Sequence, residues 1–135
     1  MKSALTWLQP LALSIIAMFA PAKQLFIAAT ILIIADCLTG VWAAYKTGQP
    51  VTSAGIRRTA NKLILYNLGI GCGFLVQRYL MADLIPVSNI VSSALGLAEL
   101  KSIIENADKI NGGSIMKTIL ARLGSVNDTL DKKDT

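Results

Sequence analysis

The sequence contains no histidine, and only two of its 135 residues are cysteines, Cys37 and Cys72. Both cysteines lie inside apolar runs, without the paired spacing of a zinc site or a disulfide framework. Charged residues make up 16% of the chain, whereas a soluble domain has about a quarter. These shortages argue against zinc binding and Cys–His catalysis, and they indicate lipid as the main solvent of the chain.

The arrangements that enzymes and nucleic-acid-binding proteins need are missing as well. No pair of acids and no Ser–His arrangement falls in a predicted cleft, and residues 47–62 do not match the phosphate-binding G-x-x-x-x-G-K pattern. The net charge is +5, but the basic residues lie in loops and the C-terminal tail without interleaved aromatic residues. We therefore expect no catalytic residues, no cofactor or metal ion, and no nucleic-acid partner.

Hydrophobic residues make up 53% of the chain and form four apolar stretches, Ala4–Ala22, Leu25–Tyr45, Leu63–Ile85 and Leu84–Ala98. At a rise of about 1.5 Å per residue, the second and third comfortably cross a hydrocarbon core about 30 Å thick. The first is interrupted near Pro10, and the fourth is short and rich in serine. This pattern predicts an all-α integral membrane protein, with three to four transmembrane helices followed by short amphipathic C-terminal helices.

The first apolar stretch has two interpretations. Lys2, the apolar region after it and the Ala20-Pro21-Ala22 sequence resemble a secretory signal peptide with its cleavage site. Cleavage there would start the mature chain almost inside the next membrane segment. A retained helix, kinked or begun near Pro10, is therefore the favoured prediction.

Basic residues predict the orientation of the chain in the membrane. The loop between the second and third stretches contains four basic residues and no acid: Lys46, Arg57, Arg58 and Lys62. By the positive-inside rule this loop is cytoplasmic, where its basic side chains can contact anionic head groups. Ser53 is expected to cap the helix that follows. Four spans would place both termini in the cytoplasm, whereas counting only the first three would leave the basic tail outside.

Asp36 is the one acid inside the second stretch. It lies roughly 18 Å along the helix from Gln24, where a carboxylate costs about 2.5–3.5 kcal/mol on insertion scales. Four-residue spacing places Asp36, Gly40 and Ala44 on one helix face, with Thr39 beside them, and these small residues allow close helix association. Whether this face packs against another helix or lines water is left open by the sequence.

The third stretch contains a second small-residue pattern, Gly69, Gly71 and Gly73, which predicts close helix packing. Packing between the second and third helices would bury Asp36 against Asn67, which falls at a similar depth. Arg78 is expected nearer the outer surface, where it extends outward or pairs with Asp83. Direct pairing of Arg78 with Asp36 is less favoured.

The chain changes character after Ala98. Apolar residues recur at helical spacing within Leu97–Ile110, and Glu99, Glu105, Asp108 and Lys109 are expected on or beside the opposite, polar face. Asn111-Gly112-Gly113 should end this helix, and Ser114 should cap another, Ile115–Leu123, with an apolar stripe of Met116, Ile119, Leu120 and Leu123. Such helices suit the membrane surface or a partner protomer, and packing on their own bundle is an equal alternative. We therefore expect a transmembrane domain over residues 1–98, cytoplasmic or membrane-surface amphipathic helices over 99–124, and a disordered polar tail over 125–135.

Several of these residues form a recognisable order. Asp36-Cys37-Leu38-Thr39-Gly40 is followed by Ala44, Lys46 and Gly48, then by Ser53-Ala54-Gly55, and residues 99–106 match the pattern E-x-x-S-I-x-E-N. In this order and spacing the chain resembles the phage lysis and toxin-secretion holin family over approximately residues 28–123. The resemblance assigns family motif positions to Ser102, Glu105 and Asn106. Residues 107–111 and the absence of prolines after Gly112 depart from the family pattern.

The resemblance implies a small phage protein that forms homo-oligomers in the lipid bilayer of the host cytoplasmic membrane. Its lesions would release an endolysin, its functional partner without stable contact, or a toxin. Two other hypotheses stay open. Asp36 and the helix count also suit a small ion-coupled transporter, and an antiholin-type regulator would join hetero-oligomers without making a pore.

Overall fold

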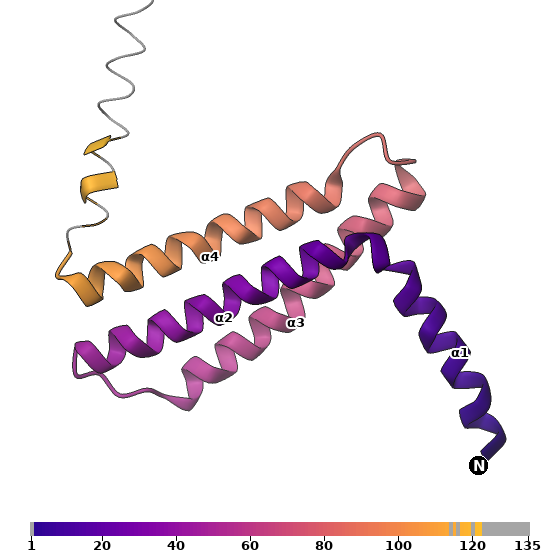
Figure 1. The fold of residues 1–135 in the computed structure, drawn as a ribbon, viewed down its shortest axis with the longest axis horizontal. Helices are drawn as coiled ribbons and strands as arrows, with labels where there is room; N and C mark the ends of the chain where they lie inside the picture. Colours follow the sequence, from indigo (N-terminus) through magenta and orange to yellow (C-terminus); the bar gives the residue numbers. More distant parts are fainter. Residues whose placement is uncertain (1, 114, 116, 120, 123–135) are drawn as a thin grey trace, which may run out of the picture. The chain divides into compact units, whose positions relative to one another are not determined.

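A computed structural model describes residues 2–113, 115, 117–119, 121 and 122, and the regular structure assigned within them is helical throughout. The elements are α1 (Lys2–Met18), the 3-10 turn η1 (Ala20–Ala22), α2 (Lys23–Lys46), α3 (Ser53–Leu75), the π-helical η2 (Val76–Leu80) and α4 (Val87–Asn111) (Figure 1). The prediction of an all-α protein is confirmed.

Three helical segments are long and apolar enough to cross a membrane. They are Ala20–Lys46, Ser53–Leu80 and Val87–Asn111, with 27, 28 and 25 residues. The prediction of three to four spans is therefore confirmed, with three spans. The helix that is too short to span is the first one and not, as expected, the fourth. Within α1 the apolar part, Leu8–Met18, is shorter than a span, whereas the fourth region, expected to be marginal, is a full-length helix.

Helix α4 joins two segments that were expected to be separate, an apolar one ending at Ala98 and an amphipathic one starting at Leu97. A lone glycine, Gly96, is the only strong helix breaker in this region, and a single glycine costs about 1 kcal/mol relative to alanine. The expected boundary at residue 98 thus falls inside one continuous helix. The helix ends as predicted, because Gly112 and Gly113 adopt positive φ angles of 77° and 86°.

Some polar side chains of α4 are buried, while several of its large apolar side chains are exposed. Ser88 and Glu99 are buried, at 4% and 1% exposure, while Ile90, Leu97 and Leu100 are exposed. We call the inward residues the α4 polar stripe, and its members are Ser88, Ser92, Glu99, Ser102 and Asn106. Glu99, which was expected on or beside the polar face of an amphipathic helix, is therefore buried within the chain. In lipid the outer surface is apolar, so polar side chains turn toward other helices to find partners.

Helix α1 begins well before Pro10, which lies inside it. Of the two predicted alternatives, a kink or a start near this proline, the start is therefore wrong. The Ser14 hydroxyl donates a hydrogen bond to the Pro10 carbonyl, 2.8 Å away. The break that separates α1 from α2 comes later, at Phe19–Ala22, where Pro21 stands in the first turn of η1.

The chain divides into two compact units, and each of the three long helices contributes residues to both. Unit 1 comprises Met1–Ile31 and Ala60–Gly96, and unit 2 comprises Leu32–Thr59 and Leu97–Thr135. In unit 1 an aromatic cluster packs the turn before α2 onto α3. Phe19 lies 6.0 Å from Phe26 in an edge-to-face arrangement and 5.8 Å from Phe74, measured between ring centroids.

Candidate functional site

The acid of the second apolar stretch meets a carboxamide from α4. In unit 2, Asn106 donates from Nδ2 to Oδ1 of Asp36 at 3.1 Å, and the same amide lies 3.4 Å from the Asp36 carbonyl oxygen. It also lies 3.3 Å from the Thr39 hydroxyl oxygen. We call Asp36, Thr39 and Asn106 the polar cluster. It gives an intramembrane carboxylate a hydrogen-bond donor from another helix, which offsets part of its insertion cost.

Thr39 and Gly40 allow this approach in different ways. The Thr39 hydroxyl donates to the carbonyls of Ala35 and Asp36, at 2.9 and 3.0 Å, which leaves its lone pairs available to Asn106. A Cβ atom added at Gly40 would lie 3.4 Å from Nδ2 of Asn106. Any larger side chain at position 40 would therefore push against the amide. Ala44, the fourth predicted member of this face, is half-buried beside the buried Ala43.

The residue that reaches Asp36 differs from the one that the sequence suggested. Asn67, expected to face the acid, donates from Nδ2 to the Leu63 carbonyl of its own helix at 2.6 Å. Asn106 was singled out only through its place in a family motif. The available signal was the spacing of Ser88, Ser92, Glu99, Ser102 and Asn106, which fall on one helix face.

The glycines of α3 are used for close packing inside unit 1. A Cβ atom at Gly73 would lie 3.4 Å from the Ser88 Cα and from the Val91 side chain, both on α4. Gly69 faces Val91 at 3.9 Å, and Gly71 faces the rings of Phe19 and Phe26 at 3.6 and 3.8 Å. The glycines that were predicted to pack closely therefore contact other segments of the same chain.

The segment between α3 and α4 holds an ion pair that was one of two alternatives predicted for Arg78. The guanidinium of Arg78 contacts the carboxylate of Asp83, and the Gln77 amide donates to the same carboxylate at 3.4 Å. Gln77 also accepts from the backbone N–H and the hydroxyl of Ser88, at 3.2 and 2.6 Å, and so caps the start of α4. This cap was not among the sequence-based predictions. Asp83 itself has a φ of 60°, uncommon for a residue other than glycine.

The residues predicted to lie in a cytoplasmic loop are at or near helix ends. Lys46 is the exposed last residue of α2, Arg57 and Arg58 are exposed near the start of α3, and Lys62 is half-buried. The expected cap, Ser53, is the first residue of α3. The hydroxyl of Thr52 accepts from the Gly55 N–H at 3.4 Å instead, so the capping position is one residue earlier.

The remaining motif positions lie along the last turns of α4. Ser102 is half-buried, and Glu105 is exposed and pairs with Lys101 at 2.9 Å. Beyond the helix, the Ile115 N–H donates to the Asp108 carboxylate at 2.7 Å. The predicted cap Ser114 and three members of the predicted stripe, Met116, Leu120 and Leu123, lie outside the described residues. No group of three potential metal ligands occurs within the described ranges.

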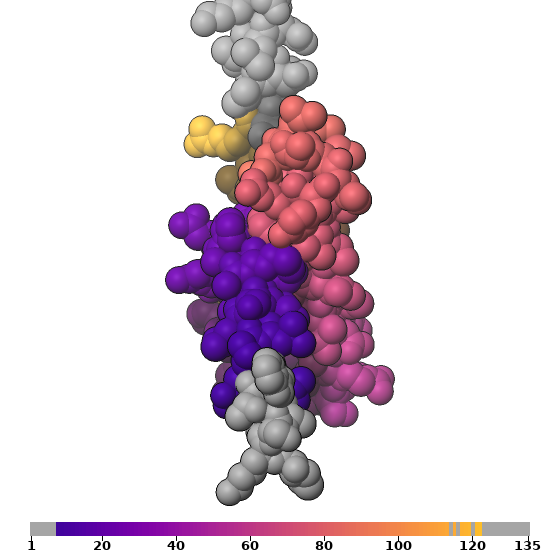
Figure 2. Space-filling model, turned by 90° about the vertical axis from the view of Figure 1, so that its right-hand side faces the viewer, coloured from indigo at the N-terminus to yellow at the C-terminus, as the bar shows by residue number. Residues whose placement is uncertain are grey.

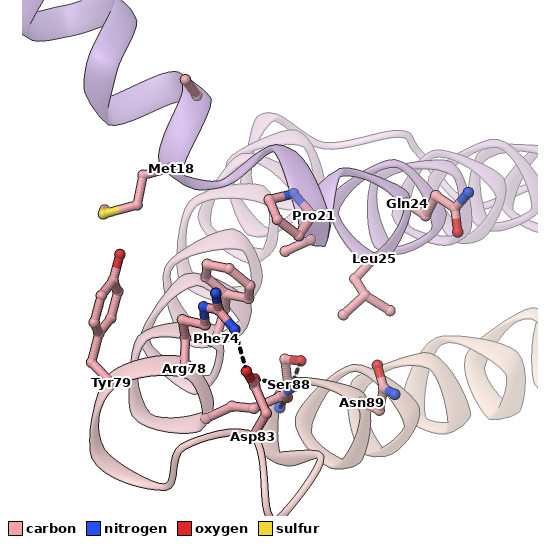
Figure 3. A pocket seen from close by; sticks show the side chains of 13 residues that line it. Met18, Pro21, Gln24, Leu25, Phe74, Arg78, Tyr79, Asp83, Ser88 and Asn89 are labelled. Carbon is pink, nitrogen blue, oxygen red and sulfur yellow. Dashed lines mark hydrogen bonds and ion pairs between the residues drawn. The ribbon is translucent and has the colours of Figure 1, made fainter.

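Unit 1 also contains a cavity of about 560 Å³ that the sequence did not predict. We call it the rim cavity, because the three candidate spans begin or end beside it. Figure 2 looks onto this end of unit 1, where the indigo surface of α1 and early α2 lies beside the salmon surface of the α3–α4 turn. Figure 3 shows Arg78 and Asp83 paired at its wall, with Phe74, Leu25 and Met18 around it.

Three long apolar helices and an inward polar stripe define an integral membrane protein of the all-α class. A family model described as the bacteriophage holin family matches residues 14–128. The chain therefore belongs to the bacteriophage holin family, as its motifs predicted. No curated protein and no solved structure matches it.

Proposed function

We propose that the protein is a holin that oligomerises in the host cytoplasmic membrane and forms lesions that release an endolysin or a toxin. One observation carries this proposal beyond the family. In the single chain the α4 polar stripe is turned inward while Ile90, Leu97 and Leu100 face outward, so the chain can remain dispersed in lipid. A water-filled lesion needs polar groups at its wall. Lesion formation would require part of this stripe to exchange its partners within the chain for water or another copy.

Orientation follows from the helix bounds and the positive-inside rule. With Ala20–Lys46, Ser53–Leu80 and Val87–Asn111 as the spans, the basic turn after Lys46 is cytoplasmic and the residues after Asn111 return to the cytoplasm. With these three spans the basic tail is inside. The earlier three-span count put it outside because that count included the first stretch and omitted α4. Helix α1 would begin the chain on the outer side. This proposal replaces the four-span arrangement with both termini inside.

Inducible expression in bacteria tests lesion formation directly. We expect membrane potential to collapse after a delay and a co-expressed endolysin to lyse the cells, whereas endolysin alone leaves them intact. Normal potential at high membrane expression would contradict the proposal. If the protein instead delays lysis by a second holin, it is an antiholin. Proton-driven efflux that is lost in Asp36→Asn, without lysis, would indicate a transporter.

The helix face formed by Asp36, Thr39, Gly40 and Ala44 can be tested within the same assay. Gly40→Leu places a side chain against Asn106, and Asp36→Ala removes the acceptor of its amide. We expect both changes to alter lysis time and crosslinked oligomers, while Cys72→Leu at an exposed position of α3 leaves both unchanged. Unchanged lysis curves for both variants would remove the proposed role of this face.

A further inference from the structure

We propose that the rim cavity binds the head group of a zwitterionic phospholipid with a primary ammonium group, such as phosphatidylethanolamine. Its volume of about 560 Å³ lies within the usual range for small-molecule sites, roughly 300–1,000 Å³. Neither the family assignment nor the proposed lesion requires such a site. The inference uses the membrane location of the protein, but not its lytic activity.

The cavity presents both charges that such a head group needs. Arg78 and Asp83 both line it, with side chains 59% and 40% exposed. The guanidinium has five N–H donors and uses Nη1 on Asp83, so donors remain for a phosphate oxygen. The carboxylate accepts from Arg78 and Gln77 and has further lone pairs for an ammonium group. A purely anionic head group would satisfy Arg78 but meet repulsion from Asp83.

Two carboxamides complete the polar lining. Gln24 and Asn89 both border the cavity and are exposed, and neither side chain has a hydrogen-bond partner among the described residues. Each offers donors to a phosphate and an acceptor to an ammonium group. Gln77 and Ser88 also line the cavity, but they bond to each other and hold the start of α4 in place.

The position of the cavity indicates a lipid rather than a water-soluble ligand. One candidate span begins at Ala20, another ends at Leu80 and the third begins at Val87, so the cavity lies where the helices leave the hydrocarbon. Leu25 and Phe74 provide apolar surface beside the charged pair for the glycerol and upper acyl region (Figure 3). Tyr79 has the amphipathic character typical of the membrane–water interface.

Native mass spectrometry of the detergent-purified full chain can test the specificity. The protein is incubated with equal amounts of phosphatidylethanolamine, phosphatidylglycerol and phosphatidylcholine that carry identical acyl chains. We expect a preference for phosphatidylethanolamine of roughly tenfold, the effect of one additional charge-assisted hydrogen bond. Equal binding of the three lipids, or a preference for phosphatidylglycerol, would overturn the proposal. Displacement by glycerophosphoethanolamine at equal concentration would also overturn it, because the site would then need no acyl chain.

A matched pair of double variants isolates the cavity. Arg78→Gln with Asp83→Asn removes both cavity charges, and Lys101→Gln with Glu105→Gln removes the exposed ion pair on α4. Each double variant keeps the net charge of the chain. We expect the first to lower the preference below about twofold and the second to keep it. Equal loss in both, or full preference in the first, would contradict the site.

A third variant distinguishes loss of the binding site from misfolding of the first double variant. Asn89→Leu leaves the Arg78–Asp83 pair intact and places an apolar residue at an exposed position. We expect native helicity by circular dichroism together with a preference reduced by about threefold, as for loss of one neutral hydrogen bond. Wild-type preference in Asn89→Leu would overturn the assigned role of the carboxamides.

Discussion

The two units hold α4 by different means. In unit 1, Gly73 lets the backbone of α4 approach α3, so that an added Cβ atom would lie 3.4 Å from the Ser88 Cα. In unit 2, Asn106 of α4 reaches α2 through side-chain hydrogen bonds to Asp36 and Thr39. Close packing depends on the complementary shapes of the two helices. A side-chain hydrogen bond can instead be replaced by one to water or to another chain. Unit 1 thus holds α4 through close packing, and unit 2 holds it through hydrogen bonds between side chains.

The largest effect is expected from Gly73→Leu. Its side chain would meet backbone atoms of α4, which cannot move aside as a flexible side chain can. Overpacking of this kind costs about 1–3 kcal/mol, and we expect a value near the upper end. Unfolding of the detergent-solubilised protein, followed by circular dichroism, measures the loss. Cys72→Leu, exposed on the same helix, is the control, and equal unfolding curves for the two variants would refute the packing contrast.

Asn106→Leu removes the hydrogen bonds that hold α4 in unit 2, and it should lower the free energy of unfolding by less than Gly73→Leu does. Hydrogen bonds between transmembrane helices contribute about 0.6–2 kcal/mol, because unfolded helices in the membrane find other partners. We expect destabilisation in this range and coupling to Thr39→Val in a double-mutant cycle. Asn61→Leu, at an exposed position of α3, controls for the added apolar side chain. A loss as large as that of Gly73→Leu would remove the distinction between the units.

Gln77→Leu tests whether the Gln77 side chain caps the start of α4 in unit 1. It removes the acceptor of the Ser88 N–H and hydroxyl, and loss of a helix cap costs about 0.5–2 kcal/mol. We expect faster hydrogen exchange confined to the first turn of α4, with the exposed loop variant Gln49→Leu as control. Unchanged exchange at Ser88 would show that Gln77 is not its cap in solution.

The smallest effect is expected from removing the Arg78–Asp83 pair. Both side chains are substantially exposed, and such pairs contribute about 0–1 kcal/mol. Arg78→Gln with Asp83→Asn should therefore unfold within this range of the wild type. A much larger loss would make the ion pair a structural part of the turn and would group it with the packing of Gly73.

The sequence predicted features that depend on neighbouring residues of one helix. The cost of a charge in lipid identified Asp36, and four-residue spacing identified Gly40 and Ala44 on the same face. Pairing with Asp83, five residues away, was one of two alternatives predicted for Arg78. The glycines after Asn111 predicted the end of α4 in the same local way. These inferences need no knowledge of which helices are neighbours.

Partners on other helices were harder to predict. Asn106 was missed at Asp36 because α4 was divided at residue 98, and its inward polar stripe made it resemble a helix at the membrane surface. The Gln77 cap depends on the π-helical turn Val76–Leu80, where the Met81 N–H bonds to the Val76 carbonyl. Nothing in the local pattern of residues indicates that extra residue in the turn.

The inward stripe of α4 has a consequence for biogenesis. Helix α4 has the same hydropathy as the α3 span, below that of α2, and its acid Glu99 is buried in the folded chain, so its insertion should be helped by helices already in the bilayer. Helices α2 and α3 precede it in the chain and already carry the Gly73 surface and the Asp36 carboxylate that receive it. The helices that contact α4 are thus made before it. A chain truncated after Leu80 should still insert as a helical hairpin, whereas α4 expressed alone should insert less efficiently than it does in the full chain.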